Sequence, residues 1–398
     1  MLRNDDHHIC DVKQLFEKSA EKYKEKTAFW MKDENQAHTS ITYKQLYRDV
    51  RGLGTSLISL GMKDKRVAII GRNSYEWVVS YLTALCATGG AVLLDKEFSL
   101  PELKYFLNVS EASCVIFSNE LEDIFWQIKN DGVTGLETLI SMDKEKSQGE
   151  ILSFRELIEE GMQEEASGDC SFSSERKTPD NLCSIVFTAG TTGVPKGVKL
   201  SHLNIATELT LVSQVLKINE NCIFFSKFPF HCAAECICGI LLPLVNGASI
   251  TCNEDFNYNF EISKAAGYSL TECSSIAALN PDNNSAGLLL PGMKVKIEQI
   301  DPETGIGEIC LAGENIMTGY CDNPELTDKV LKEGWLYTGD LGRIDERGHI
   351  YISGRKENII VREKGKYICP EELEKILKSI PLIDECMVWG KDSYENKA

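Results

Sequence analysis

The residues of this chain that could do chemistry are most concentrated in one segment near its middle. Residues 184–197 read Ser-Ile-Val-Phe-Thr-Ala-Gly-Thr-Thr-Gly-Val-Pro-Lys-Gly, an apolar run followed by threonines, glycines and one lysine. Glycines let backbone N–H groups converge on an anion, hydroxyls add hydrogen-bond donors, and a lysine supplies a point charge. The segment has the chemistry of a phosphate-binding loop. A glycine- and threonine-rich turn between a strand and a helix is the alternative.

The loop differs from the P-loop of nucleoside triphosphatases. A P-loop has Gly before its lysine and Ser or Thr after it, whereas this chain has Pro195 and Gly197. The pattern after the loop predicts a helix over about residues 203–216, with Ser201 and Asn204 as candidate N-caps. A buried strand, the loop and this helix are therefore expected in that order.

The first part of the chain alternates amphipathic helical patterns with short apolar runs. Helices are expected over residues 11–24, 43–60 and 75–86 and from Pro101, and strands over 67–70, 91–94 and 114–117. This alternation indicates an α/β fold with a parallel sheet covered on both faces. No Gly-x-Gly-x-x-Gly surrounds Gly71, which argues against a nicotinamide or flavin enzyme.

Two later stretches differ from the first part of the chain in composition and in hydrophobic pattern. Residues 159–181 are acidic, serine-rich and poor in apolar residues, which predicts a solvated surface loop. From Lys294 onward short strand patterns alternate with turn signals, and residues 345–348 read as the turn of a hairpin. The C-terminal part is therefore expected to be rich in strands.

Composition limits the function classes. The chain has 398 residues, 43% hydrophobic and 26% charged, with a formal charge of −18. That charge argues against a nucleic-acid partner. No apolar run has the length of a membrane span, and no apolar stretch follows Arg3, so a cytoplasmic protein is expected. Of 15 cysteines only Cys232, Cys236 and Cys238 cluster, and no second pair at ligand spacing follows, so a metal site is not expected there.

Four motifs in order resemble one family. Residues 188–197, Gly-Tyr-Ser-Leu-Thr-Glu at 267–272, Gly-Trp-Leu-Tyr-Thr-Gly-Asp at 334–340 and Gly-Arg-Lys-Glu-Asn at 354–358 resemble the signatures of the adenylate-forming superfamily of acyl-CoA synthetases, luciferases and peptide-synthetase adenylation domains. The resemblance implies a large N-terminal domain of stacked mixed and parallel sheets with helices, a small β-rich subdomain, and a partial α+β C-terminal domain. The expected domains are residues 1–354 and 355–398.

The resemblance also implies roles. The cofactors would be ATP, Mg²⁺ and coenzyme A, with Glu272 helping to hold the metal. Asp340 would accept the ribose hydroxyls, and His231 would line the acyl site. The implied catalytic residues are Thr188, Lys196, Thr271, Glu272 and Arg355. The implied nucleotide-binding residues are Thr188, Gly190, Thr191, Thr192, Gly193, Lys196, Tyr268, Thr271, Asp340 and Arg355.

Each of these roles has an alternative. Taken singly, Glu272 and Asp340 could be surface acids, and Arg355 could belong to an exposed ion pair worth about 0–1 kcal/mol. A lone histidine such as His231 is more often structural than catalytic. The motifs together favour function for Glu272, Asp340 and Arg355, and leave His231 evenly balanced.

The subclass follows from finer resemblance. Residues 199–204 and 267–274, and residues 365–366 with 370–374, are similar to those of bacterial long-chain fatty-acid–CoA ligases, which implies a fatty acid as the substrate. No integral membrane segment is expected, and a lipid substrate is compatible with peripheral membrane contact. Relatives carry a much longer segment where residues 253–266 stand, and they continue to a late lysine beyond this chain's last residue. Ser269 and Ala189 depart from the motifs in smaller ways, and Ser269 would matter if its backbone needed a positive φ.

Two function hypotheses follow, and a third is weaker. The first is an enzyme that forms acyl-AMP and then acyl-CoA. The second is a shortened, catalytically impaired fragment or pseudoenzyme that only binds nucleotide. An amino-acid adenylation module is a third hypothesis, and it predicts a downstream carrier domain.

Overall fold

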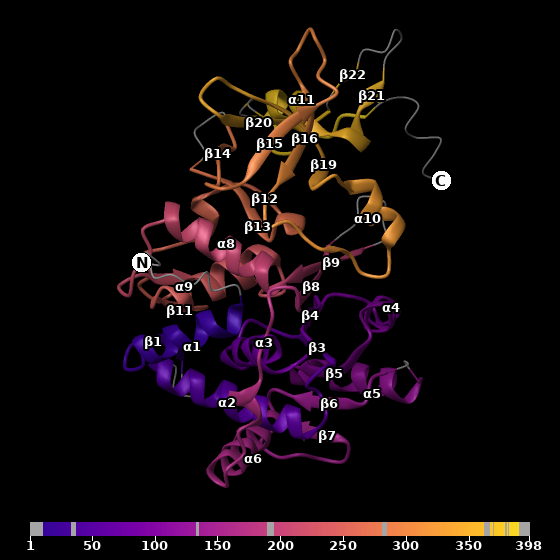
Figure 1. Cartoon of the computed structure of the whole chain (residues 1–398). Coiled ribbons are helices and arrows are strands. Elements are labelled where there is room, and N and C mark those ends of the chain that lie inside the picture. The colour runs from indigo at the N-terminus through magenta and orange to yellow at the C-terminus, as the bar shows by residue number, and fades with distance from the viewer. Residues whose placement is uncertain are drawn as a thin grey trace. The chain divides into compact units, whose positions relative to one another are not determined.

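The computed structural model divides the chain into two units. The α/β unit comprises Met1–Lys264, Ser269–Ile276 and Glu314–Thr327, and the β-rich unit comprises Ala265–Tyr268, Ala277–Gly313 and Asp328–Ala398. Figure 1 shows the helices of the first unit in indigo to magenta and the strands of the second in orange to yellow. The structure describes residues 11–32, 37–132, 135–188, 195–280, 285–361, 367–368, 370–378, 380 and 382–389.

The larger sheet of the α/β unit carries the phosphate-loop segment. Its described strands, in order across the sheet, are β17 (Gly319–Tyr320), β9 (Lys196–Ser201), β8 (Leu182–Thr188), β4 (Ala91–Leu93), β3 (Arg66–Ile70), β5 (Ala112–Phe117), β6 (Thr138–Ser141) and β7 (Ile151–Ser153). Strands β8 to β7 are parallel, whereas β9 and β17 are antiparallel to their neighbours. The apolar runs of β3, β4 and β5 are buried, as expected for a sheet covered on both faces.

A second, smaller sheet lies in the same unit. Its described strands run β10 (Ile223–Phe225), β11 (Ser249–Thr251), β1 (Thr27–Lys32) and β2 (His38–Thr42). The helices of the unit are α1 (Val12–Lys22), α2 (Tyr43–Ser59), α3 (Tyr75–Ala87), α4 (Leu100–Ser110), α5 (Glu122–Asn130), α6 (Phe154–Ala166), α7 (Ser171–Ser174), α8 (His202–Val215), the π-helical Ala234–Leu241 and α9 (Leu242–Val245). Helix α10 (Pro324–Val330) begins in it.

The helices predicted from periodicity are confirmed by α1, α2, α3 and α4, and their ends follow local chemistry. The side chains of Asp11, Thr42, Ser74 and Ser201 accept hydrogen bonds from backbone N–H groups in the first turns of α1, α2, α3 and α8. Gly61, with φ +79°, follows α2 in a conformation that suits glycine.

Two sequence-based expectations are wrong. The loop is followed by strand β9 before α8 begins, because residues 196–201 pair with β8 and bury Val198 and Leu200. Residues 159–166, expected to be loop, belong to α6, whose buried face carries Phe154, Leu157, Ile158 and Gly161. Helix α6 approaches α2 so closely that a Cβ on Gly161 would lie 1.9 Å from the carbonyl oxygen of Gly52.

The β-rich unit is mostly one antiparallel sheet. Its described strands run β12 (Ala266–Leu270), β13 (Ser275–Leu279), β14 (Gly287–Leu289), β20 (His349–Arg355), β19 (Trp335–Ile344), β16 (Gly307–Ala312) and β15 (Lys294–Glu298), with β18 (Leu331–Lys332) on β19. The last two residues of β12 and the first two of β13 are counted with the α/β unit. The pair β21 (Ile360–Val361) and β22 (Tyr367–Ile368) and helix α11 (Pro370–Lys378) follow. The hairpin predicted at residues 345–348 is confirmed: Asp345 accepts from the N–H groups of Arg347 and His349.

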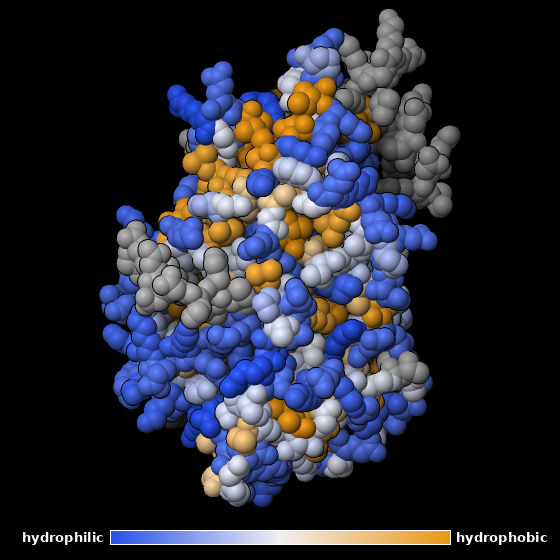
Figure 2. Space-filling model, in the orientation of Figure 1, coloured by the Kyte–Doolittle hydropathy of each residue, from blue (hydrophilic) through white to orange (hydrophobic). Residues whose placement is uncertain are grey.

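The β-rich unit exposes several large apolar side chains. Leu288, Ile300 and Ile352 are 46%, 57% and 43% exposed. Figure 2 shows apolar residues gathered over this unit on the face in view, whereas the region around α2 and α6 is mostly hydrophilic. Among the described residues, no helix combines the length and the apolar character needed to cross a membrane.

Candidate active site

The predicted phosphate loop is rooted in an antiparallel pair of strands. Thr188, the last residue of β8, faces Lys196, the first residue of β9. The Thr188 hydroxyl donates to the Lys196 carbonyl oxygen over 3.4 Å. The predicted site residues Gly190, Thr191, Thr192 and Gly193, and the departure at Ala189, lie outside the described residues. The structure thus fixes where the loop leaves the sheet and where it returns.

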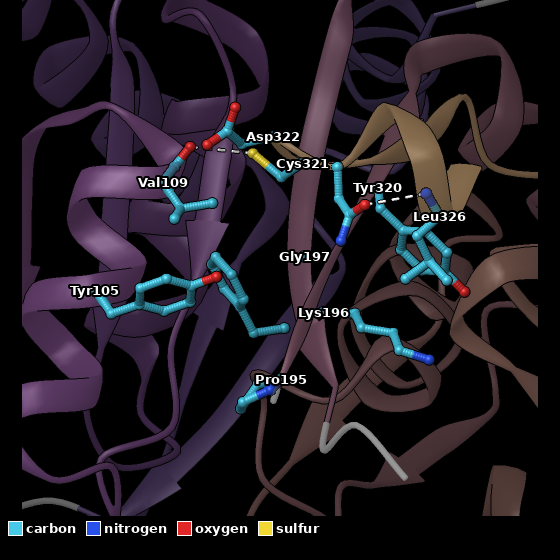
Figure 3. Close-up of a pocket in the computed structure, with 11 residues that line it drawn as sticks. Tyr105, Val109, Pro195, Lys196, Gly197, Tyr320, Cys321, Asp322 and Leu326 are labelled. Atoms are coloured by element: carbon cyan, nitrogen blue, oxygen red, sulfur yellow. Dashed lines mark hydrogen bonds between the residues drawn. The ribbon is translucent and has the colours of Figure 1, made fainter. Parts of the chain in front are cut away.

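Lys196 and Glu272 are brought together by a residue that the motifs did not identify. The ammonium of Lys196 lies 5.7 Å from the centre of the Tyr320 ring, and the Tyr320 hydroxyl donates to Glu272 Oε1 at 2.8 Å. Tyr320 is placed there by β17, which pairs with β9. Figure 3 shows the Lys196 side chain leaving β9 on the side of Tyr320 and away from Tyr105. An ammonium and a carboxylate thus flank one phenol, which suits a site for phosphates and a divalent cation.

A small pocket adjoins this group. It has a volume of about 100 Å³ and is bounded by α4 through Tyr105 and Val109, by Lys196 and by Cys321, whose thiol donates to the Val109 carbonyl oxygen at 3.2 Å (Figure 3). Ligand pockets generally enclose about 300–1,000 Å³. The pocket is therefore too small to hold a nucleotide.

Thr271 and Glu272 lie in a short 3₁₀ helix, Thr271–Cys273, which follows β12. Both are half-buried, so Glu272 is not a fully exposed surface acid. The Glu272 backbone carbonyl accepts from the Met317 N–H at 2.9 Å. Ser269, where the family motif has glycine, is exposed in β12 and is not among the residues with positive φ. This serine therefore introduces no left-handed strain.

In the β-rich unit, three predicted nucleotide-binding residues form one cluster. Asp340 on β19 faces Arg355 on β20, and Arg355 Nε lies 2.7 Å from Asp340 Oδ1. The hydroxyl of Tyr268 donates to Asp340 Oδ2. Asp340 is only 4% exposed, so the interpretation of a surface acid is wrong for it. Arg355 is 39% exposed at its side chain, so this ion pair has one partner in contact with solvent.

His231 lies beside an acid that sequence reasoning missed. Its Nε2 is 3.4 Å from Asp95 Oδ2, just beyond the end of β4. Burial lowers the pKa of His231, and the nearby Asp95 carboxylate partly offsets this effect. The imidazole is thus a neutral, mostly buried group at neutral pH. No pattern in the sequence marks Asp95, because only the sheet places it near His231.

The cysteine cluster behaves as buried apolar packing. Cys236 and Cys238 are fully buried, and burial raises the pKa of both thiols. Across the described ranges, no three histidine, cysteine or acidic side chains are grouped so as to hold a metal ion. Buried free cysteines commonly act as small hydrophobes.

Comparison with known proteins identifies the family. Residues 16–266 match the family model of the AMP-binding enzymes, more than half of the chain, and the chain therefore belongs to that family. The 4-coumarate–CoA ligase-like 1 of Arabidopsis thaliana is 26% identical, over 92% of this chain and 80% of its own length. Long chain acyl-CoA synthetase 2 of the same plant is 22% identical, over 90% of this chain and 72% of its own length.

The fold is shared with a solved ligase. The crystal structure of the anthranilate CoA ligase AuaEII in complex with anthranoyl-AMP superimposes with a TM-score of 0.80 at 21% identity, covering 96% of this chain and 84% of that chain. The predicted fold class is thereby confirmed. The alignment with the coumarate relative spans 450 positions, more than the 398 residues of this chain, so that relative carries segments that this chain lacks.

Proposed function

We propose that this chain uses ATP to activate a carboxylic acid, first as an acyl-adenylate and then as an acyl-CoA thioester. The observation that carries the proposal is the Lys196–Tyr320–Glu272 group at the root of the phosphate loop. In this group an ammonium, which would bind phosphates, and a carboxylate, which would bind a divalent metal, contact the same phenol. Membership of the AMP-binding family and the acyl-AMP held by a structural neighbour support the same chemistry.

The proposed reaction has two steps. A carboxylate oxygen of the acid attacks the α-phosphorus of ATP, and the bond to the β-phosphate oxygen breaks with release of pyrophosphate. The thiolate of coenzyme A then attacks the acyl carbonyl carbon, and AMP leaves with the electron pair of the acyl–oxygen bond. Both steps move charge onto phosphate oxygens, which fixed cations and hydrogen-bond donors stabilise.

The residues keep the roles that the family resemblance implies. We assign Thr188, Gly190, Thr191, Thr192, Gly193 and Lys196 to the β- and γ-phosphates. Thr271 is assigned to the α-phosphate, and Asp340, aligned by Tyr268 and Arg355, to the ribose. His231 is proposed to line the acyl site. We also retain the proposed domain boundary between residues 354 and 355.

Glu272 fits the binding of Mg²⁺. Its Oε1 accepts a hydrogen bond from the Tyr320 hydroxyl at 2.8 Å, and its side chain is half-buried beside the root of the loop. Mg²⁺ prefers oxygen ligands and is commonly held by one or two carboxylates together with substrate phosphates. When bound, the ion would neutralise the charge that develops on the leaving pyrophosphate. Glu272 would be a ligand of this ion next to the phosphates of ATP.

For the acid, we propose a fatty acid. The motif resemblance and the similarity to a long-chain acyl-CoA synthetase support this class. The similarity to a 4-coumarate–CoA ligase-like protein makes aryl acids the competing class.

The direct test is acid-dependent release of pyrophosphate from ATP. It uses a panel of medium- and long-chain fatty acids, coumarate, anthranilate and amino acids, followed by thioester formation with coenzyme A. We expect release with fatty acids and a thioester product. Release with aryl acids alone would correct the substrate class. ATP binding without release for any acid would instead support the second hypothesis, a nucleotide-binding protein without turnover.

A further inference from the structure

The turn after Glu272 holds a backbone conformation that its residues disfavour. Ser274 has φ +60° and Ser275 has φ +125°, two consecutive non-glycine residues on the positive side. Such conformations are unfavourable for residues with a Cβ and persist only where the surroundings impose them. Thr271 and Glu272 lie directly before this turn, so whatever imposes it also fixes them.

The turn is held by hydrogen bonds that a buried acid accepts and that a buried amide donates and accepts. Glu208 of α8 accepts from the Ile276 N–H at 2.8 Å through Oε1, and from Asn315 Nδ2 at 2.9 Å through Oε2. Asn315 Nδ2 also donates to the Cys273 carbonyl oxygen at 3.2 Å, and the Ser274 hydroxyl donates to the Asn315 carbonyl oxygen at 2.7 Å. Both sides of the strained turn are thus tied to the same pair of side chains.

This arrangement differs from ordinary core packing. Glu208 and Asn315 are both 0% exposed. Burial raises the pKa of Glu208 to about 8, although hydrogen bonds from Asn315 and Ile276 act in the opposite direction. Burying an acid costs folding free energy unless hydrogen bonds compensate for the loss of water. Both carboxyl oxygens of Glu208 accept hydrogen bonds, one from the Ile276 N–H just after the turn and one from Asn315.

A second connection leads from this pair to the proposed metal ligand. Two residues after Asn315, the Met317 N–H donates to the backbone carbonyl of Glu272. Three residues further on, Tyr320 donates to the Glu272 side chain. The segment that begins at Asn315 therefore fixes Glu272 by its backbone and by its carboxylate.

We propose that Glu208 and Asn315 are positioning residues that hold Thr271 and Glu272 in the geometry needed for the α-phosphate and the metal. The proposal rests on the proposed function of that site, but the claim that the two residues hold the turn can be tested without enzymatic turnover. Neither residue touches the nucleotide in this scheme. Their effect is transmitted through the turn at Ser274 and Ser275.

The experiment compares Glu208→Ala, Glu208→Gln and Asn315→Ala with the unchanged chain. In each, the rate of acid-dependent pyrophosphate release is measured against ATP concentration, well below the unfolding midpoint of that variant. A small misplacement of reacting groups lowers rates by roughly 10²-fold. We expect Glu208→Ala to lose about that factor in kcat/KM for ATP, and Glu208→Gln, which retains an acceptor for Ile276, to recover a large part of it.

Hydrogen exchange of the Ile276 and Met317 amides is the second readout, and it does not depend on activity. Losing a hydrogen bond of about 1.4 kcal/mol corresponds to roughly tenfold faster exchange. We expect such acceleration in Glu208→Ala and Asn315→Ala. The matched control is Glu235→Ala, which removes another buried acid, one bound by Ser226 instead. It should leave the exchange of both amides unchanged.

The outcomes separate the two proposals. If the unchanged chain releases no pyrophosphate but the exchange pattern is as expected, the proposed function fails and the positioning of the turn stands. If Glu208→Ala keeps both the ATP dependence and the amide exchange of the unchanged chain, the positioning role is overturned. If Glu208→Ala does not fold, Asn315→Ala decides in the same way.

Discussion

Tyr320 makes two different contacts that two substitutions can separate. Its hydroxyl donates to Glu272, and its ring lies under the ammonium of Lys196. Phenylalanine keeps the ring and loses the hydroxyl, whereas leucine loses both. Comparing the two variants therefore measures each contact in turn.

The expected magnitudes follow from the environment. A hydrogen bond to a charged group contributes about 1.5–3 kcal/mol, and half-burial of Glu272 favours the lower end of that range. Tyr320→Phe should therefore raise the half-saturating Mg²⁺ concentration by roughly tenfold. A cation–π contact contributes about 0.5–1 kcal/mol at a partly exposed site, so Tyr320→Leu should add roughly two- to fivefold in KM for ATP.

The assay is pyrophosphate release, titrated with Mg²⁺ at saturating ATP and then with ATP at saturating Mg²⁺. Tyr105→Phe serves as the control, because Tyr105 lines the same small pocket from the side of α4, whereas the Lys196 side chain extends toward Tyr320 (Figure 3). An unchanged Mg²⁺ dependence in Tyr320→Phe would refute the coupling of Tyr320 to Glu272. Equal behaviour of the phenylalanine and leucine variants would refute the contact with Lys196.

Three further predictions concern charge, pH and packing. Lys196→Met should weaken ATP binding by roughly 10- to 100-fold in calorimetry, because it removes a charge-assisted contact. Lys196→Arg keeps the charge and should retain part of the affinity. Unchanged affinity in Lys196→Met would argue against the phosphate site. Burial raises the pKa of Glu208 from 4.5 to about 8, so the folded state retains a proton that the unfolded state loses, and this stabilisation is lost as pH rises through about 8. Glu208→Gln should therefore flatten the fall of unfolding free energy between about pH 5 and 8 in denaturant titrations, and equal slopes would contradict the assignment. Gly161→Ala should lower stability by about 1–3 kcal/mol in thermal unfolding, since its Cβ would meet the Gly52 carbonyl oxygen, whereas Gln163→Ala on the exposed side of α6 should change little.

Several strands of the larger sheet could be predicted because apolar runs are local signals. The runs at 67–70, 91–94 and 114–117 became the buried strands β3, β4 and β5. Strand β9 was not predicted because it is short and begins with the lysine of the loop motif. Helix α6 was not predicted, and its part after residue 158 was taken for a loop because that stretch is acidic and poor in apolar residues. Its close approach to α2 is a contact that only the fold reveals.

The sequence by itself determined the candidate chemistry of this protein. Thr188, Lys196, Glu272, Asp340 and Arg355 stand in motifs whose spacing is fixed along the chain. Only the tertiary structure decided that Asp340 is buried against Tyr268 and Arg355, that Tyr320 stands between Lys196 and Glu272, and that Glu208 and Asn315 brace the turn after Glu272. The physical reason is that these contacts join residues far apart in the sequence. Strand pairing and burial create such contacts, and they leave no local pattern in the chain.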